Sequence, residues 1–298
     1  SWIDQRLSRT GTPNRILILK SETASGKSTA LPPELFLEFI NGKTRKGIIC
    51  TQPRVLTAVW NVHEILKHHG KVLRLQENIG WVTKYDKLRP AKSSGIVSAT
   101  IGTFGMYLKI MSDEDIMAKY KFILIDEVHE RSMQSDVVFY MLKSFLSRCA
   151  DKPECPMIIL MSATFEPEKY MRYYGVGDEN FIWCSGQAVG RDELWSWNQD
   201  RTVNNWPQAA AEIIRGICTG SGVDDEPERA DVLIFVPGKK EFKQCKQWLD
   251  RINVDLTPDR TFSILWIDSE AQRTETADYR RIFIPLADQT NQIRGKSC

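Results

Sequence analysis

The sequence lacks the features of a membrane or secreted protein. None of its apolar runs approaches the ~20 residues needed to cross a bilayer, and its first four residues, Ser1-Trp2-Ile3-Asp4, lack the basic and apolar regions of a signal peptide. Its 7 cysteines form no C-x-x-C pair, so neither a disulfide framework nor a zinc site is expected. We therefore expect an intracellular, cytoplasmic protein with buried free thiols.

The sequence also has little net charge. Its 40 Lys and Arg oppose 38 Asp and Glu, which gives a formal net charge of +2 over 298 residues. A balanced total neither supports nor excludes a nucleic-acid partner, because acidic surface elsewhere can compensate a basic groove. The length predicts about two domains, and the composition, 42% hydrophobic and 26% charged, is typical of a globular protein.

Short and continuously apolar runs recur along the first half of the chain, separated by amphipathic segments such as 55–67 and 137–146. Such runs are typical of parallel strands covered on both faces. Their alternation with helical segments predicts a doubly wound α/β domain. The runs are 16–19, 47–50, 95–98, 122–125 and 157–160, and a second set follows at 231–235, 262–266 and 281–284.

A phosphate-binding loop follows the first of these runs. Gly-Lys-Ser at 26–28 opens a helical segment, and a loop of this kind presents backbone N–H groups and a helix N-terminus to phosphates. Lys27 would reach the β- and γ-phosphates, and Ser28 would bind Mg²⁺. Ser21 replaces the usual first glycine, at a cost of ~1 kcal/mol if that position needs a positive φ. The predicted nucleotide-binding residues are Thr23, Ala24, Ser25, Gly26, Lys27, Ser28 and Thr29.

An acidic pair, Asp126 and Glu127, follows the apolar run 122–125. An isolated acidic pair at a strand end is usually a solvated turn. Together with the phosphate loop, however, it lies where open α/β sheets bind their ligands. Asp126 would then hold Mg²⁺, and Glu127 would orient and deprotonate the attacking water.

The sequence Asp126-Glu127-Val128-His129, together with the phosphate loop, resembles the DExH-box helicases of superfamily 2. The continuation Glu130-Arg131-Ser132 is most similar to the DEAH/RHA-type RNA helicases. Other motifs of these helicases follow in order. Thr51-Gln52-Pro53-Arg54 and Thr100-Ile101-Gly102 resemble motifs that contact nucleic acid, Ser162-Ala163-Thr164 the motif that couples hydrolysis to movement, and 232–238 the start of a second RecA-like domain.

The resemblance implies an α/β fold of two RecA-like P-loop NTPase domains with parallel sheets, at 1–186 and 187–298, the second truncated. It implies ATP or another NTP with Mg²⁺ as cofactors. Its implied partner is RNA, single-stranded or a duplex with an overhang, with DNA not excluded. The implied catalytic residues are Lys27, Asp126 and Glu127, the coupling residues His129, Ser162 and Thr164, and the nucleic-acid-binding residues Gln52, Arg54, Thr100 and Gly102.

The sequence departs from the helicase pattern near its end. Residues 281–290 are similar to the fifth motif, with Ala287-Asp288 in place of Ala-Glu, and the final motif with its arginine fingers is missing. The chain is then either a segment of a longer protein, which we expect, or an incompetent motor. Gly-Lys-Ser-Thr with Leu31-Pro32 is also similar to helicases of RNA-virus polyproteins, and such an origin is our hypothesis.

A catalytically silent helicase-like module that binds RNA or protein is the alternative function. The altered phosphate loop and the departures in the fifth motif favour it, whereas the retained Lys27, Ser28, Asp126 and Glu127 oppose it. Both readings allow nucleotide binding, so only turnover separates them. A P-loop kinase or transporter ATPase is excluded by Ser162-Ala163-Thr164 and by the motif at 232–238.

Overall fold

The structure is a computed structural model that describes residues 2–22, 25–164, 166–185, 206–219, 232–256, 262 and 264. The chain divides into two compact units, residues 1–190 and 191–298. Each unit is described by itself. Within the described residues, no helix combines the length and the apolar character that a membrane span requires.

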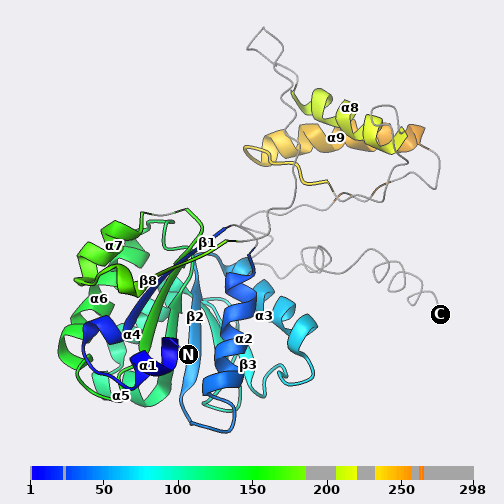
Figure 1. The fold of residues 1–298 in the computed structure, drawn as a ribbon. Helices are drawn as coiled ribbons and strands as arrows, with labels where there is room; N and C mark the ends of the chain where they lie inside the picture. Colours follow the sequence, from blue (N-terminus) through cyan, green and yellow to red (C-terminus); the bar gives the residue numbers. More distant parts are fainter. Residues whose placement is uncertain are drawn as a thin grey trace. The chain divides into compact units, whose positions relative to one another are not determined.

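The first unit is built on an eight-stranded sheet of order β4-β3-β5-β2-β6-β7-β1-β8 (Figure 1). Neighbouring strands pair in parallel, except that β4 pairs antiparallel with β3. Each of the five apolar runs of the first set coincides with a strand, so the predicted doubly wound α/β domain is confirmed. The strands are β1 (Ile16–Ser21), β2 (Gly47–Gln52), β3 (Ile79–Val82), β4 (Lys87–Leu88), β5 (Ile96–Thr100), β6 (Tyr120–Ile125), β7 (Met157–Ser162) and β8 (Phe181–Cys184).

Helices cover both faces of this sheet. Successive residues of β1 feed two separate cores, because side chains alternate across a strand. Ile16 and Ile18 pack in the core that α4, α6 and α7 cover, whereas Leu17 and Leu19 pack in the core under α2 and α3. Burial on both faces explains why the runs are continuously apolar. The helices are α1 (Trp2–Leu7), α2 (Lys27–Phe39), α3 (Val55–His69), α4 (Ile101–Ile110), α5 (Asp113–Lys119), α6 (Met133–Cys149) and α7 (Pro167–Tyr174), with 3-10 turns at Thr12–Asn14 and Asp178–Asn180.

The described part of the second unit contains two helices, α8 (Trp206–Thr219) and α9 (Lys239–Asp255). They pack through a small core that includes Ala211, Ile214 and Leu249, with Phe262 and Ile264 against it. The strand predicted at 231–235 is wrong for its described residues. Residues 232–236 form neither helix nor strand, and Phe235 is 87% exposed.

An isolated apolar segment gains no strand hydrogen bonds without a neighbour to pair with, and the described residues of this unit contain no strand to supply one. The remaining predicted strands of this unit, and the fifth motif at 281–290, lie outside the described residues, apart from Phe262 and Ile264.

Candidate active site

The candidate site lies at the carboxyl ends of β2, β6, β7 and β1, which are adjacent in the sheet. Open α/β sheets bind their ligands at this edge, because the loops that follow the strands converge there. β2 and β7 each end at a predicted functional residue, β6 ends directly before one, and the phosphate loop follows β1. The sheet order therefore brings together side chains that are far apart in the sequence.

The phosphate loop connects β1 to α2. Gly26 is the N-cap of α2 and has a φ of +79°, a left-handed conformation that glycine adopts without a Cβ clash. Ser21 is buried in β1, outside the left-handed region, so its replacement of glycine carries no backbone strain. The Ser25 hydroxyl donates to Ser21 Oγ at 2.9 Å. Of the predicted nucleotide-binding residues, Thr23 and Ala24 lie outside the described residues.

Asp126 is the most tightly held group of the site. The residue directly follows β6 and is only 3% exposed. Ser28 Oγ and Gln52 Nε2 both donate to Asp126 Oδ2, the latter at 2.8 Å. The backbone N–H of Glu127 donates to Oδ1 at 2.9 Å. A buried carboxylate that accepts three hydrogen bonds is both satisfied and fixed in orientation.

Gln52 is buried beside the acidic pair. It is 2% exposed, and its amide donates to Asp126. This contact makes Gln52 part of the site, and its predicted contact with a nucleic acid stays a prediction. Since β2 pairs with β6, the carboxyl end of β2 lies beside the acidic pair. That adjacency is the signal that could have assigned Gln52 to the site.

Glu127 occupies a strained and polar position. It has a φ of +50°, a backbone conformation that residues other than glycine rarely adopt. Lys27 Nζ lies 3.6 Å from Oε1 and His129 Nδ1 lies 3.3 Å from Oε2. Burial, and next the charge of Asp126, raise the pKa of Glu127 above its ordinary value, while Lys27 and His129 oppose this shift. The carboxylate therefore binds a proton more tightly than an exposed glutamate does.

His129 links the acidic box, which comprises residues 126–129, to β7. Its Nδ1 lies 2.7 Å from Ser162 Oγ, and the backbone N–H of Thr164 donates to the same hydroxyl at 3.3 Å. The three predicted coupling residues are thus brought together. Tyr170, which no sequence motif singles out, also stabilises this turn, because its hydroxyl donates to the carbonyl of Val128 at 2.8 Å.

The other predicted nucleic-acid contacts differ in how accessible they are. The Arg54 side chain is exposed and pairs with Glu130 at 3.1 Å. The Thr100 hydroxyl is buried and lies 2.7 Å from the hydroxyl of Thr103. Gly102 lies in the first turn of α4, where an added Cβ would come 2.9 Å from the Gln134 side chain. Arg54 is the one predicted nucleic-acid-binding residue with a long cationic side chain, so it is suited to contact a phosphate.

The donor set fits Mg²⁺ that arrives with a nucleotide. No group of three or more His, Cys, Asp or Glu side chains in the described parts of the chain could hold a metal by itself. The Ser28 hydroxyl and the Asp126 carboxylate touch each other and supply the oxygen ligands that Mg²⁺ prefers. Mg²⁺ is usually bound by one or two protein ligands together with substrate phosphates and water.

Comparison of the chain with known proteins finds similar proteins among the helicases. Residues 3–172 match the family described as DEAD/DEAH box helicase. A curated protein of African swine fever virus, "Putative RNA Helicase B962L", is 36% identical over 94% of this chain and 31% of its own length. "Probable ATP-dependent RNA helicase DHR2" of Saccharomyces cerevisiae is 25% identical over 80% of this chain and 30% of its own length.

Among solved structures, the Escherichia coli DEAH/RHA helicase HrpB superposes with a TM-score of 0.60 and 18% identity, over 92% of this chain and 32% of that chain. This likeness shows the fold alone, which is the RecA-like α/β fold predicted from the motifs. The chain spans about a third of the length of the curated relatives that it matches, 31% for the viral protein and 30% for the yeast protein.

Proposed function

The chain belongs to the DEAD/DEAH box helicase family, and on that premise we propose that it hydrolyses a nucleoside triphosphate with Mg²⁺ and couples hydrolysis to movement along RNA. The observation that carries the proposal is the contact between the phosphate loop and the acidic box. Ser28 touches Asp126, and Lys27 lies 3.6 Å from Glu127. Phosphoryl transfer depends chiefly on such positioning and on charge stabilisation.

Lys27 has two partners in this proposal. Its ammonium is mostly buried and lies beside Glu127, and a bound triphosphate offers it a stronger anionic partner. When Lys27 turns to the phosphates, Glu127 loses a neighbour that lowers its pKa. The carboxylate then becomes a stronger base for the proton of the attacking water.

Asp126, Ser28 and Gln52 form the metal-binding side of the site. Bound Mg²⁺ would neutralise charge on the β- and γ-phosphate oxygens. Gln52 and the backbone N–H of Glu127 hold the Asp126 carboxylate in place while one of its oxygens is offered to the metal. Substitution of a residue that orients a metal ligand in this way typically lowers metal affinity 10- to 100-fold.

His129 and Ser162 supply the proposed coupling. His129 touches Glu127 on one side and Ser162 on the other, so a shift of Glu127 upon hydrolysis reaches the end of β7. Arg54 is our proposed contact to the phosphate backbone, because its exposed guanidinium can exchange Glu130 for a phosphate. Both similar proteins are named as RNA helicases, which supports RNA as the substrate.

The alternative is a catalytically silent module, which the altered phosphate loop and the departures in the fifth motif favour. Ser21 is a strand residue without a positive φ, so its replacement of glycine no longer supports this alternative. Residue 24 and the fifth motif lie outside the described residues, whereas Lys27 lies beside Glu127 and Ser28 touches Asp126, which supports turnover.

The test is Mg²⁺-dependent ATP hydrolysis by the natural full-length protein, with and without single-stranded RNA. We expect RNA to stimulate turnover and Lys27→Met to abolish it. Lys169→Met, which changes a surface lysine of α7, is the matched control and should leave turnover unchanged. Nucleotide binding without turnover, with or without RNA, would overturn the proposal and favour the silent module.

A further inference from the structure

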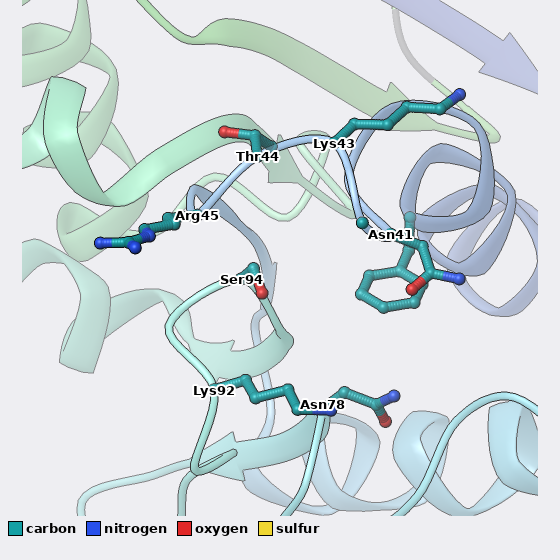
Figure 2. Close-up of a pocket in the computed structure, with 9 residues that line it drawn as sticks. Asn41, Lys43, Thr44, Arg45, Asn78, Lys92 and Ser94 are labelled. Carbon is teal, nitrogen blue, oxygen red and sulfur yellow. The ribbon is translucent and has the colours of Figure 1, made fainter.

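A cavity of about 490 Å³ opens at the amino-terminal edge of the sheet, at the opposite ends of the strands from the active site. The loop that follows α2 forms one wall, and the segment that precedes β5 faces it across the opening (Figure 2). None of the lining residues belongs to the site described above. Those that matter here are Phe36, Asn41, Lys43, Arg45, Lys92 and Ser94.

The lining contains three cations and no carboxylate. Two of the cations already have partners. Lys92 pairs with Glu77 at 2.8 Å, and Lys43 Nζ donates to the carbonyl of Glu38 at the negative end of α2. Arg45 forms no ion pair with any residue that the structure describes. Its side chain extends outward from the rim (Figure 2), so contact with an anion in the cavity requires the guanidinium to turn toward the opening.

More positive charge lies along the same edge. Lys46 and Arg15 directly precede β2 and β1, and Lys121 is the second residue of β6. Lys46 and Arg15 donate to carbonyls of the turn at 152–154. Arg15 is 1% exposed, and its Nε and Nη1 have no hydrogen-bond partner among the described residues.

These neighbouring cations are partly buried and interact with one another. Burial lowers the pKa of Arg15, of Lys46 and of Lys121. Among the charges near Lys46, Glu154 has the largest effect and raises its pKa, whereas Lys121 and Arg15 each lower it by less. Arg15 lowers the pKa of Lys121, and Asp4 opposes this shift. The three cations place additional positive charge at the edge where the cavity opens, which favours an anion there.

We propose that this cavity binds a phosphoryl group, with the Arg45 guanidinium as its main contact. Arginine matches phosphate oxygens with paired N–H donors, and Lys43 and Lys92 add charge at the rim. The Asn41 amide and the Ser94 hydroxyl supply neutral hydrogen bonds within the same lining. The phosphoryl group can belong to an RNA backbone or to a free polyphosphate, and the two sources share this chemistry.

The test uses two probes, inorganic pyrophosphate and the trinucleotide UUU, each titrated by calorimetry. Both are titrated into the Lys27→Met variant, because an intact phosphate loop would also bind pyrophosphate. Arg45→Gln is then added in this background, with Arg172→Gln on the exposed side of α7 as the matched control. The melting temperatures of all the variants are compared, because an unchanged value shows that the fold is intact.

We expect Arg45→Gln to weaken binding of one probe by about tenfold, and Arg172→Gln to leave it unchanged. Dependence on Arg45 for pyrophosphate alone identifies a free phosphate as the source, and dependence for UUU identifies a strand backbone. Binding of neither probe, or an equal loss with Arg45→Gln and Arg172→Gln, would overturn the proposal. These results do not depend on nucleotide turnover, so the cavity and the proposed function can fail separately.

Discussion

The two edges of the same sheet differ in how their charged side chains are paired. At the carboxyl edge, groups of opposite sign contact one another, as Lys27 does with Glu127 and Arg54 with Glu130. At the amino edge, Arg15 and Lys46 donate to backbone carbonyls, and burial is the main cause that lowers the pKa of each. The functional groups of the first edge pair with one another, whereas the cavity at the second edge is lined by three cations and no carboxylate, and of these cations Lys92 pairs with Glu77 outside the lining.

This difference separates two kinds of binding. An edge with paired charges can exchange an internal partner for a metal and a triphosphate and return to the paired state after product leaves. A cavity lined by cations and no carboxylate gains most from a bare anion. The comparison therefore predicts that substitutions at the carboxyl edge change metal dependence and turnover, whereas those at the amino edge change only anion affinity.

Asp126→Asn should have the largest effect at the carboxyl edge. The variant loses the carboxylate that Ser28 and Gln52 orient, and we expect turnover to fall by at least about 100-fold. The measurement is steady-state ATP hydrolysis at saturating Mg²⁺. Asp136→Asn, in a surface ion pair with Arg131, is the control, and an equal loss in that variant would break the comparison.

Gln52→Met should raise the Mg²⁺ concentration required for half-maximal turnover by about 10-fold. Methionine keeps the length of the side chain but cannot donate to Asp126, so the carboxylate loses one of its three donors. Stability alone does not predict a change in Mg²⁺ dependence. Gln5→Met on the exposed face of α1 should not change it. A normal Mg²⁺ requirement with a weakened RNA affinity would return Gln52 to the role that its motif suggested.

Glu127→Gln should stabilise the fold at neutral pH. The folded-state pKa of Glu127 is raised, chiefly by burial, so the folded protein binds this proton more tightly than the unfolded chain does. The contribution of Glu127 to stability is thus lost as pH rises through the raised pKa. We expect an increase in Tm of about 1–3 °C at pH 8 that disappears below about pH 4.

Thermal unfolding of wild-type and Glu127→Gln protein across this pH range is the measurement. Glu168→Gln on α7 is the matched exposed control. A gain in Tm that is the same at every pH would show that ionisation of Glu127 is not its cause.

Arg54→Gln should have the smallest effect on stability and a measurable effect on RNA binding. A surface ion pair contributes about 0–1 kcal/mol, so Tm should change little. If Arg54 contacts a phosphate, affinity falls for all RNA sequences and the slope of log K against log salt decreases by about one. Arg172→Gln should leave that slope unchanged, and an unchanged slope in Arg54→Gln would remove Arg54 from the interface.

The sequence predicted the sheet well because burial on both faces leaves a direct signature. β1, β2, β6 and β7 are continuously apolar, and their order along the chain alternates with helices. The phosphate loop and the acidic box were found because their residue types at fixed spacing follow such strands. The apolar run at 232–236 carries the same signature without forming a strand, since pairing also requires a neighbour that local sequence does not reveal.

Two features of the site required the three-dimensional structure. The side chain of Gln52 contacts Asp126 because β2 ends beside β6. The motif alone predicted a contact with nucleic acid and gave no sign of this neighbour. The positive φ of Glu127 arises from a turn held by Val128 N–H to Met161 O and by Tyr170. Neither contact can be read from the residues adjacent to Glu127.

The most direct test of the account compares ATP binding with ATP hydrolysis in wild-type and Glu127→Gln protein. Because Lys27, Ser28 and Asp126 remain, the account predicts that the Kd for Mg²⁺-ATP changes less than about threefold while single-turnover hydrolysis falls by at least about 100-fold. Hydrolysis at the wild-type rate in the variant would contradict the assignment of Glu127 as the base. It would show that the carboxyl edge of this sheet is not where the water is activated.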